Sequence, residues 1–425
     1  MQNKSTLKRK FYDSLKRGTG EAYLIAKANP NVDFSNYIIK GALTNYAYDG
    51  QAENSRAQYI FNLISLSGKK EKIRKAVLRG LATEREDTWS LTHLFDLVKI
   101  YAQHGDEEAR KILYDNFLQN PIEGSDWVGS FEILELDGLK GLFFIAEKYG
   151  KWLEQNPEDW QDDHLINLFQ ENNPQLKVKE ELQKAAKSNR FIKVYLDNIK
   201  KTKANYAKQK HVSGTYSDIV DEVLNSKPFL SFWRKRNLTE ADIVEIAERL
   251  IVEKDKEKQE KLLEVFDSHR FPLDSEFVLQ LAKQKPTSKN RIREYAIDAL
   301  TYLKSESIRQ FALDKIPKSN RPQQYINILY SNYKEGDAKL LMEVATKFKS
   351  EQMMENLAVS YIDIFEANPT QECREPLEVL YSKMTCGLHR NSLVKILIGN
   401  NVLSERIKNE IPYDSDLETR ELLGE

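Results

Sequence analysis

The stretch Ile292-Arg-Glu-Tyr-Ala-Ile-Asp-Ala-Leu-Thr-Tyr-Leu303 decides the fold of this chain. Its apolar side chains recur at steps of three and four residues, which places them in one stripe of a helix. The stripe consists of Ile292, Tyr295, Ala296, Ala299, Leu300 and Leu303. The pattern returns in Leu341 to Phe348 and in Met354 to Phe365. A short helix with one apolar stripe cannot bury that stripe alone, so residues 290–411 are predicted to form stacked, antiparallel pairs of amphipathic helices.

The composition of the whole chain favours the same class. Among 425 residues, only 17 are glycine and 12 are proline. An all-β protein would need such turn residues every eight to twelve positions. Charged residues make up 30% of the chain and apolar residues 40%, a balance that suits a thin, distributed core. The sequence therefore predicts an all-α protein.

The spacing of the expected helices is regular at both ends of the chain. In the first third, helix pairs begin 36 residues apart, at Phe34, Lys70 and Asp106. In the last third, the first apolar anchors of successive pairs follow at steps of 34, 28 and 34 residues. These anchors are Ile292, Ile326, Met354 and Leu388. Steps of this size bracket the period of two-helix repeats, so we predict an α-solenoid rather than an ordinary helical bundle.

Two segments carry a family resemblance. Lys289 to Leu300, followed by Ser307-Ile-Arg-Gln-Phe-Ala-Leu, resembles a HEAT-type helical repeat, in which an arginine and an aspartate punctuate apolar positions. The closing segment, Asp414 to Leu423, is similar to a truncated repeat of that kind. Tetratricopeptide arrays share the 34-residue period, but their Trp-x-x-Leu-Gly-x-x-Tyr signature is absent. The resemblance implies a right-handed superhelix of antiparallel helix pairs, HEAT-like or ARM-type.

The spacing of the expected helices divides the chain into three parts. Residues 1–119 are expected to form N-terminal helical repeats, and residues 215–425 the C-terminal repeats, within one continuous superhelix. Residues 120–214 are predicted to be an irregular helical middle, with an inserted loop at its start and a long basic helix. Thr239 is a suitable N-cap for the next helix, and Asp242 stands where a capping box would place it.

Basic residues gather in the middle of the chain. Leu176 to His211 contains eleven basic and three acidic residues, a local charge of +8. The candidate contacts in this segment are Lys193, Lys200, Lys201 and Lys203. Just downstream, aromatic and basic residues alternate, and the candidates are Trp233, Arg234, Lys235 and Arg236. Cations beside planar side chains suit a phosphate backbone with exposed bases. The alternatives are an acidic protein partner, or a solvated face with Phe229, Phe232 and Trp233 in the core.

The loop that joins the first helix pair is a second candidate surface. In a solenoid such loops line the binding face, so Asp49, Gln51, Glu53 and Arg56 could project there. The alternative is that this segment only marks helix boundaries: Asp49-Gly50 ends one helix, Asn54 or Ser55 caps the next, and Glu53 forms an ion pair with Arg56 three residues on.

Four of the five tryptophans fall between positions 89 and 160. Trp127 is the candidate for partner recognition among them, because tryptophan is common at binding hot spots. Core filling around an irregular insertion is the alternative. Acidic residues crowd Glu154 to Asp163, and this acidic segment could face the basic one within the chain or across a dimer.

Local motifs identify no catalytic, cofactor-binding or metal-binding residues. No phosphate-binding loop or nucleophile elbow is present, and the six histidines show no ligand spacing. Cys373 and Cys386 are too few for a disulfide framework, and no secretory signal or membrane-length apolar run is visible. We therefore expect a cytoplasmic protein without a membrane contact, and we lean against an enzyme.

The sequence supports one expected function and one alternative to it. We expect a non-enzymatic scaffold whose concave surface binds a macromolecule, and we favour a protein as the partner. The alternative is nucleic acid, because some HEAT-like proteins that this chain resembles are DNA base-excision glycosylases with a basic concave face. Oligomeric state stays open.

Overall fold

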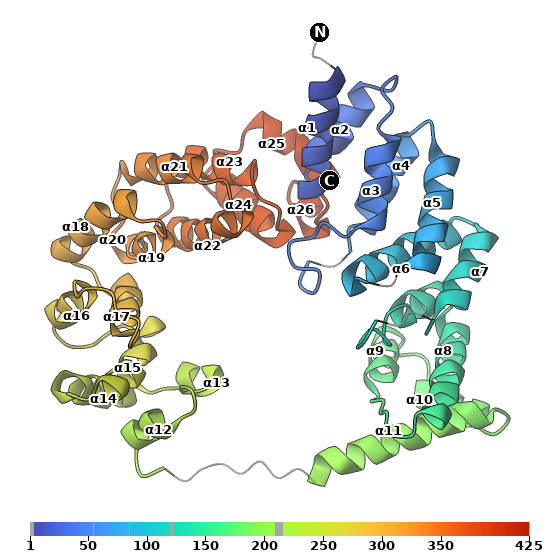
Figure 1. Ribbon diagram of the computed structural model, residues 1–425, viewed down its shortest axis with the longest axis horizontal. Helices are drawn as coiled ribbons and strands as arrows, with labels where there is room; N and C mark the ends of the chain where they lie inside the picture. Colours follow the sequence, from blue (N-terminus) through green and yellow to red (C-terminus); the bar gives the residue numbers. More distant parts are fainter. Residues whose placement is uncertain (1–3, 54, 85, 120–121, 209–215, 425) are drawn as a thin grey trace. The chain divides into compact units, whose positions relative to one another are not determined.

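The computed structural model describes residues 4–53, 55–84, 86–119, 122–208 and 216–424. Within these residues the chain is helical, with no strand, which confirms the all-α prediction (Figure 1). Two compact units divide the chain. Unit 1 comprises Met1–Val212, Thr385–Gly387 and Lys408–Glu425, and unit 2 comprises Ser213–Met384 and Leu388–Ile407. This grouping differs from the three predicted parts, because residues 408–425 belong with the N-terminal helices.

Unit 1 is built from helices that contact both their neighbours and the next helix but one. They are α1 (Lys4–Arg17), α2 (Glu21–Ala28), α3 (Ser35–Leu43), α4 (Ala57–Leu66), α5 (Lys70–Thr83), α6 (Thr88–Gln103), α7 (Glu107–Asn116), α8 (Ser130–Gln155), α9 (His164–Asn172), α10 (Val178–Ala185), α11 (Arg190–Lys208), η5 (Ile411–Tyr413) and α26 (Leu417–Glu421). Helix α3 packs on α5, α4 on α6, α5 on α7 and α6 on α8. Each apolar stripe is thereby covered on two sides, as for Ile73, Val77 and Leu81 in α5, which are fully buried.

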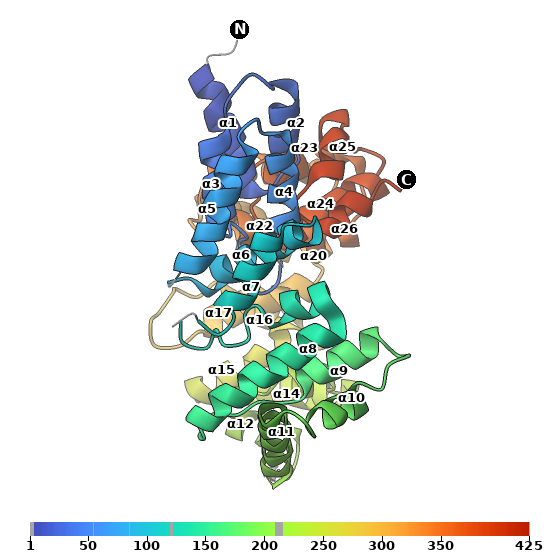
Figure 2. The same cartoon turned by 90° about the vertical axis from the view of Figure 1, so that its right-hand side faces the viewer.

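Helix α8 gives unit 1 its least regular feature. Gly138 has a φ of +56°, so the helix kinks where only glycine adopts that backbone readily. Further along, Gly150 lets α11 approach closely, because a Cβ atom there would lie 1.9 Å from the carbonyl oxygen of Phe191. Helices α8 and α11 lie against each other, with contacts between the last part of α8 and the first part of α11 (Figures 1 and 2).

The C-terminal segment of unit 1 packs on its first helices. Tyr413 stacks on Tyr23 with ring centroids 4.1 Å apart. The backbone amide of Ser415 donates to the carbonyl oxygen of Gly18 over 2.8 Å. These contacts complete unit 1 with residues from both ends of the chain.

A buried histidine in unit 1 makes the stability of the chain depend on pH. His93 in α6 is fully buried, with Nε2 3.1 Å from the Gly41 carbonyl oxygen and Nδ1 3.3 Å from Ser55 Oγ. Burial lowers the pKa of His93 from 6.5 to about 4. The unfolded chain therefore takes up a proton at a higher pH than the folded chain does. The stability that neutral His93 contributes is present above pH 6.5 and is lost as the pH falls towards 4.

We expect this histidine alone to remove about 2 kcal/mol from the free energy of unfolding between pH 7 and pH 5. Urea unfolding at both pH values would measure it, with His93→Gln as the reference that cannot titrate. The wild-type chain should lose more stability than the variant over this interval. An equal loss in both chains would contradict the assignment.

Unit 2 repeats the same packing with shorter helices. They are α12 (Ile219–Asn225), α13 (Phe232–Arg236), α14 (Glu240–Val252), α15 (Lys256–Glu264), η1 (Val265–Asp267), α16 (Ser275–Ala282), α17 (Ile292–Ala299), η2 (Leu300–Tyr302), α18 (Glu306–Lys315), η3 (Ile316–Lys318), α19 (Gln323–Ile326), α20 (Leu329–Asn332), α21 (Asp337–Lys347), α22 (Glu351–Ala367), η4 (Gln371–Cys373), α23 (Arg374–Tyr381) and α24 (Gly387–Gly399). Helix α12 packs on α14, α15 on α17, α18 on α20, α20 on α22 and α21 on α23. Helices α24 and α25 (Glu405–Glu410) contain residues of both units.

The apolar stripe between Ile292 and Leu303 is buried, as predicted. Every apolar residue of the stripe from Ile292 to Leu303 is buried, in α17, η2 and the residue that follows. The capping box is also confirmed: Thr239 Oγ1 accepts from the Asp242 amide, and Asp242 accepts from the Thr239 amide.

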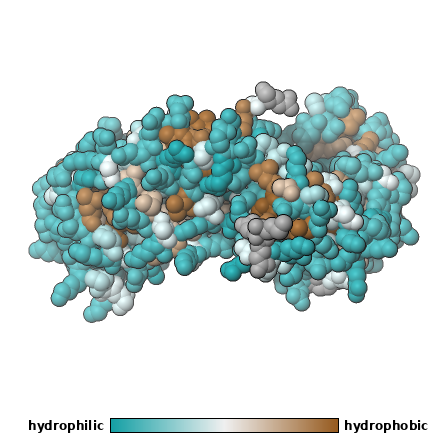
Figure 3. Space-filling model, turned by 90° about the horizontal axis from the view of Figure 1, so that it is seen from above, coloured by the Kyte–Doolittle hydropathy of each residue, from teal (hydrophilic) through white to brown (hydrophobic). Residues whose placement is uncertain are grey.

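A hydrophilic surface covers most of the face seen in Figure 3, with apolar patches between the polar side chains. Among the described residues, none of the helices combines the length and the apolar character needed to span a membrane.

Candidate functional site

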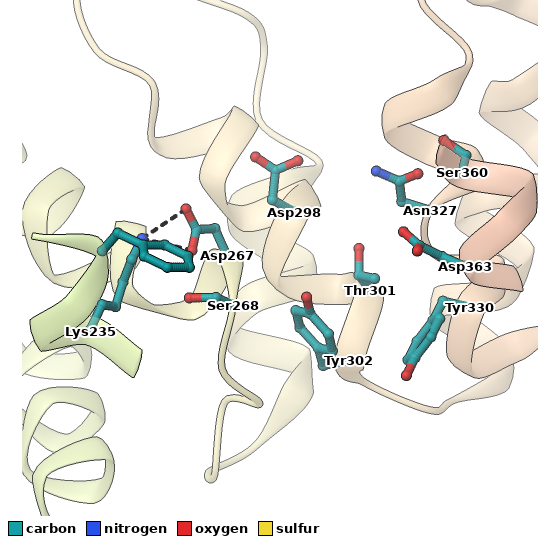
Figure 4. Close-up of a pocket in the computed structure, with 11 residues that line it drawn as sticks. Lys235, Asp267, Ser268, Asp298, Thr301, Tyr302, Asn327, Tyr330, Ser360 and Asp363 are labelled. Atoms are coloured by element: carbon teal, nitrogen blue, oxygen red, sulfur yellow. Dashed lines mark hydrogen bonds and ion pairs between the residues drawn. The ribbon is translucent and has the colours of Figure 1, made fainter. Parts of the chain in front are cut away.

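A cavity of about 370 Å³ opens in unit 2, and polar side chains from successive helices line it (Figure 4). We call it the acidic pocket and define it by Lys235, Asp267, Asp298, Asn327 and Asp363, with Tyr302 and Tyr330 beside them. The first five residues follow one another at steps of 32, 31, 29 and 36 residues, as their numbers show. Segments about 30 residues apart thus contribute polar side chains to the same cavity.

The elements that hold these five residues are those of the repeating packing. Lys235 lies in α13, Asp267 ends η1, Asp298 lies in α17, Asn327 follows α19 and Asp363 lies in α22. Figure 4 shows their side chains on neighbouring helices around the opening. The rings of Tyr302 and Tyr330 meet edge to face with centroids 6.0 Å apart. The helices therefore present a continuous polar strip with two aromatic rings.

Lys235 is the only cation that lines the acidic pocket, and its charge is already compensated. The side chain is buried, and Nζ donates to Glu264 Oε1 over 2.7 Å and to Asp267 Oδ1 over 2.9 Å. Burial works against the charged amine, but the hydrogen bonds to these two carboxylates outweigh it and raise the pKa of Lys235. Its charge serves the fold of unit 2 and is not offered to a ligand.

The other two carboxylates of the acidic pocket have no such partner. Among the described residues, neither Asp298 nor Asp363 makes an ion pair or accepts a hydrogen bond through its side chain. Burial, followed by the charge of Asp267, raises the pKa of Asp298 to about 6. Burial and then Glu366 raise the pKa of Asp363. Both groups would be stabilised by a donor or a cation from outside.

Phe232, which lines the acidic pocket, forms an exposed aromatic pair with Trp233. Phe232 is 67% exposed and Trp233 is 70% exposed, and their rings lie 5.8 Å apart, edge to face. The alternative that placed these two residues in the core is therefore wrong. Helix α13 is five residues long and starts at the Ser231 cap, so it leaves both rings outside the packed layer.

The basic residues next to this pair are largely neutralised within unit 2. Arg234 forms an ion pair with Glu222 at 3.0 Å, and Lys235 is buried against its two carboxylates. Arg236 is exposed. The expectation that Lys235 contacts a partner is wrong, because its side chain is buried and its amine is held by Glu264 and Asp267.

The basic helix α11 faces the acidic segment of its own unit. Lys203 pairs with Asp163 at 2.5 Å, and Arg190 pairs with Glu154 at 3.0 Å. This confirms the expectation that the two segments meet within the chain. Lys200 pairs with Asp197 on its own helix. Lys193 and Lys201 are exposed and make no ion pair among the described residues.

The loop before α4 contains the ion pair of the second alternative but not its helix boundaries: α3 ends at Leu43, and the N-cap of α4 is Arg56. Of the two predicted caps, Ser55 is not the N-cap and Asn54 lies outside the described residues. Asp49 accepts hydrogen bonds from the amides of Gln51 and Ala52, and both Asp49 and Gln51 are exposed. The side chains of Glu53 and Arg56 are 4% and 5% exposed and form an ion pair at 3.2 Å. The expectation that Glu53 and Arg56 project from the surface is wrong, because their charges hold unit 1 together.

The Arg56–Glu53 ion pair also makes hydrogen bonds to the backbone of other segments of unit 1. The Arg56 guanidinium donates to the carbonyl oxygens of Lys16 and Thr385, over 2.6 and 2.7 Å, and Glu53 accepts from the Gly387 amide over 2.7 Å. These groups belong to three separate segments of unit 1.

Three of the clustered tryptophans line a second cavity, of about 810 Å³, in unit 1. We call it the tryptophan cavity and define it by Trp127, Trp152, Trp160 and Tyr195 with Asp126, Asp159 and Asp162. Trp152 is 40% exposed and Trp160 is 57% exposed, so core filling does not explain them. Trp127, the predicted recognition residue, is half-buried in the wall.

Sequence reasoning missed the acidic pocket altogether. The signal that could have found it is the recurrence of polar residues, such as Asp267 and Asp298, at steps of 29 to 36 positions. Comparison with known proteins adds no further constraint: the chain matches no protein-family model, no curated protein and no solved structure.

Proposed function

We propose that this chain is a HEAT-like α-solenoid, a right-handed superhelix of antiparallel helix pairs, that binds a protein partner through its concave surface. Two features support the architecture: the contacts of many helices in both units with the next helix but one, and the steps near 34 residues in the sequence. No catalytic role is part of the proposal.

The acidic pocket is the observation that carries the proposed function. A repeat protein recognises a partner by presenting one or two side chains from each repeat along one face. Among the described residues, Asp298 and Asp363 offer acceptors without partners. Phe232 lines the same pocket, and its exposed ring meets the exposed ring of Trp233. Aromatic anchors beside oriented polar groups are typical of protein-binding hot spots.

Nucleic acid, including the glycosylase alternative, is less well supported. Its best candidates were the cations of α11 and of Arg234 to Arg236. Three of them, Lys203, Arg234 and Lys235, are neutralised by carboxylates of the same unit. The exposed aromatic pair adjoins the acidic pocket, which would repel a phosphate backbone.

A selection experiment tests the proposed function. A random 12-residue peptide display library would be panned on the full-length chain, and enriched peptides would be synthesised and titrated. We expect micromolar binders whose affinity falls about tenfold or more in Trp233→Ala and in the Asp298→Asn/Asp363→Asn double variant.

Val252→Ala is the matched control, because Val252 is also an exposed apolar residue of unit 2, at 64%. It should leave the affinity unchanged. If no peptide is enriched, or if enriched peptides bind the Trp233 and aspartate variants as tightly as the wild type, the acidic pocket is not the recognition surface.

A further inference from the structure

The walls of the tryptophan cavity in unit 1 hold aromatic rings in fixed positions. Trp152 in α8 donates from Nε1 to Asp159 Oδ2 over 2.6 Å, which sets the orientation of its indole. Tyr149 and Tyr195 stack with centroids 5.8 Å apart at an interplanar angle of 20°. Trp160, between α8 and α9, is 57% exposed and lines the same cavity. A flat ligand group would therefore meet ring faces that are already placed.

The tryptophan cavity is lined by several acidic side chains. Its lining includes four carboxylates and no lysine or arginine; the carboxylates are Glu123, Asp126, Asp159 and Asp162. Three of them accept from neutral donors: Asp126 from Gln161 Nε2 over 3.2 Å, Asp159 from Trp152, and Asp162 from the His164 amide over 2.9 Å. Among the described residues, none of the four forms an ion pair. By contrast Asp163, just outside the lining, is paired with Lys203 and Lys179.

The hydroxyl group of Tyr195, in the wall of the cavity, lacks a hydrogen-bond partner among the described residues, which is independent evidence for a ligand. The residue is 1% exposed and lines the cavity from α11, yet its hydroxyl has no hydrogen-bond partner among the described residues. A buried tyrosine hydroxyl normally finds one. Burial, reinforced by the charges of Asp162 and Asp163, raises the pKa of Tyr195, so the group stays a phenol. Its oxygen can accept a hydrogen bond from a ligand N–H.

We propose that the tryptophan cavity binds an arginine side chain in a basic segment of the protein partner. A guanidinium is planar and cationic, so it stacks on an indole face while its five N–H groups reach carboxylates and a phenol oxygen. Lysine would satisfy the charge but would not stack. The inference rests on the proposed function, since it assumes a protein partner, and it adds the chemistry of the segment that this partner presents.

The test uses two synthetic peptides with the full-length chain. One is acetyl-Gly-Arg-Gly-Arg-Gly-amide, and the other replaces both arginines by citrulline, which keeps the planar shape without the charge. Titration is followed by calorimetry and by tryptophan fluorescence. We expect the arginine peptide to bind with a Kd below about 1 mM and the citrulline peptide at least about tenfold more weakly.

Substitutions in the lining of the tryptophan cavity test whether the arginine peptide binds there. Trp160→Ala and Asp162→Asn should each weaken the arginine peptide by about fivefold or more, and both residues are exposed enough for the fold to tolerate the change. Trp233→Ala, in unit 2, should leave this affinity unchanged. Circular dichroism would verify that each variant is folded before it is titrated.

The outcomes separate this inference from the proposed function. Equal affinity for the citrulline peptide, or equal affinity in Trp160→Ala, overturns the arginine site even if display-selected peptides still depend on Trp233. Free arginine amide that binds as tightly as the peptide also overturns it, because the cavity would then be a small-molecule site. Loss of the display-selected peptides alone overturns the proposed function and not the cavity chemistry.

Discussion

Asp337→Ala is expected to lower the free energy of unfolding by about 3–5 kcal/mol. Arg309 in α18 and Asp337 at the start of α21 are both buried, and the guanidinium donates to the two carboxylate oxygens over 2.5 and 2.8 Å. Arg309 also donates to the Asn332 carbonyl oxygen over 2.9 Å. Removal of the carboxylate leaves a buried guanidinium without its counter-charge, and the cost of that desolvated charge dominates.

The chain offers a matched control for this prediction. Glu306 and Lys334 join the same two segments 28 residues apart, as Arg309 and Asp337 do, with an N–O distance of 2.6 Å. Their side chains are 72% and 58% exposed, so water and salt screen the pair. Glu306→Ala should produce no measurable change in urea unfolding. An Arg309→Met/Asp337→Leu double variant should recover most of the loss, whereas similar effects of Asp337→Ala and Glu306→Ala would refute the argument.

Gly150→Ala is expected to cost about 3 kcal/mol, the upper end of the usual range for overpacking. The added Cβ would meet the Phe191 carbonyl oxygen at 1.9 Å, and the neighbouring Phe191 backbone atoms lie within 3.0 Å. A backbone carbonyl cannot rotate away as a side chain can, so α11 must shift relative to α8. Thermal and urea unfolding would measure the loss.

The same variant links packing to the tryptophan cavity. Helix α11 carries Tyr195, which lines the cavity, so a displaced α11 should also weaken the arginine peptide. Gly68→Ala is the control, because no atom lies within 4 Å of a Cβ built there. It should change stability by no more than about 0.5 kcal/mol. If Gly150→Ala is tolerated as well as Gly68→Ala, the close approach of α8 and α11 does not matter.

The features that the sequence predicted well are those that local chemistry decides. The apolar stripe from Ile292 to Leu303 and the capping box of Thr239 and Asp242 depend on residues a few positions apart. The pairing of Glu53 with Arg56 has the same local origin, although the sequence did not show that the pair would be buried.

The features that the sequence missed depend on which helices meet. Lys235 is an ordinary lysine in a basic run until η1 brings Asp267 to it from 32 residues away. The sequence left Trp233 as either a partner contact or a core residue beside Phe232, and the five-residue helix α13 leaves both rings exposed. Lys203 gave the strongest nucleic-acid signal with its neighbours, but Asp163 on the adjoining segment neutralises it. Composition cannot anticipate such pairings.

The central claim is that acidic and aromatic surfaces, and not the basic helix α11, recognise the partner. The most direct measurement titrates a labelled 30-nucleotide DNA and a display-selected peptide against the same full-length chain at about 150 mM salt. A Lys200→Glu/Lys201→Glu/Lys203→Glu variant is titrated in parallel. The account predicts micromolar binding of the peptide, unchanged in the variant, and no DNA binding tighter than about 100 μM. Micromolar DNA binding that the lysine variant abolishes, together with no peptide binding, would contradict it.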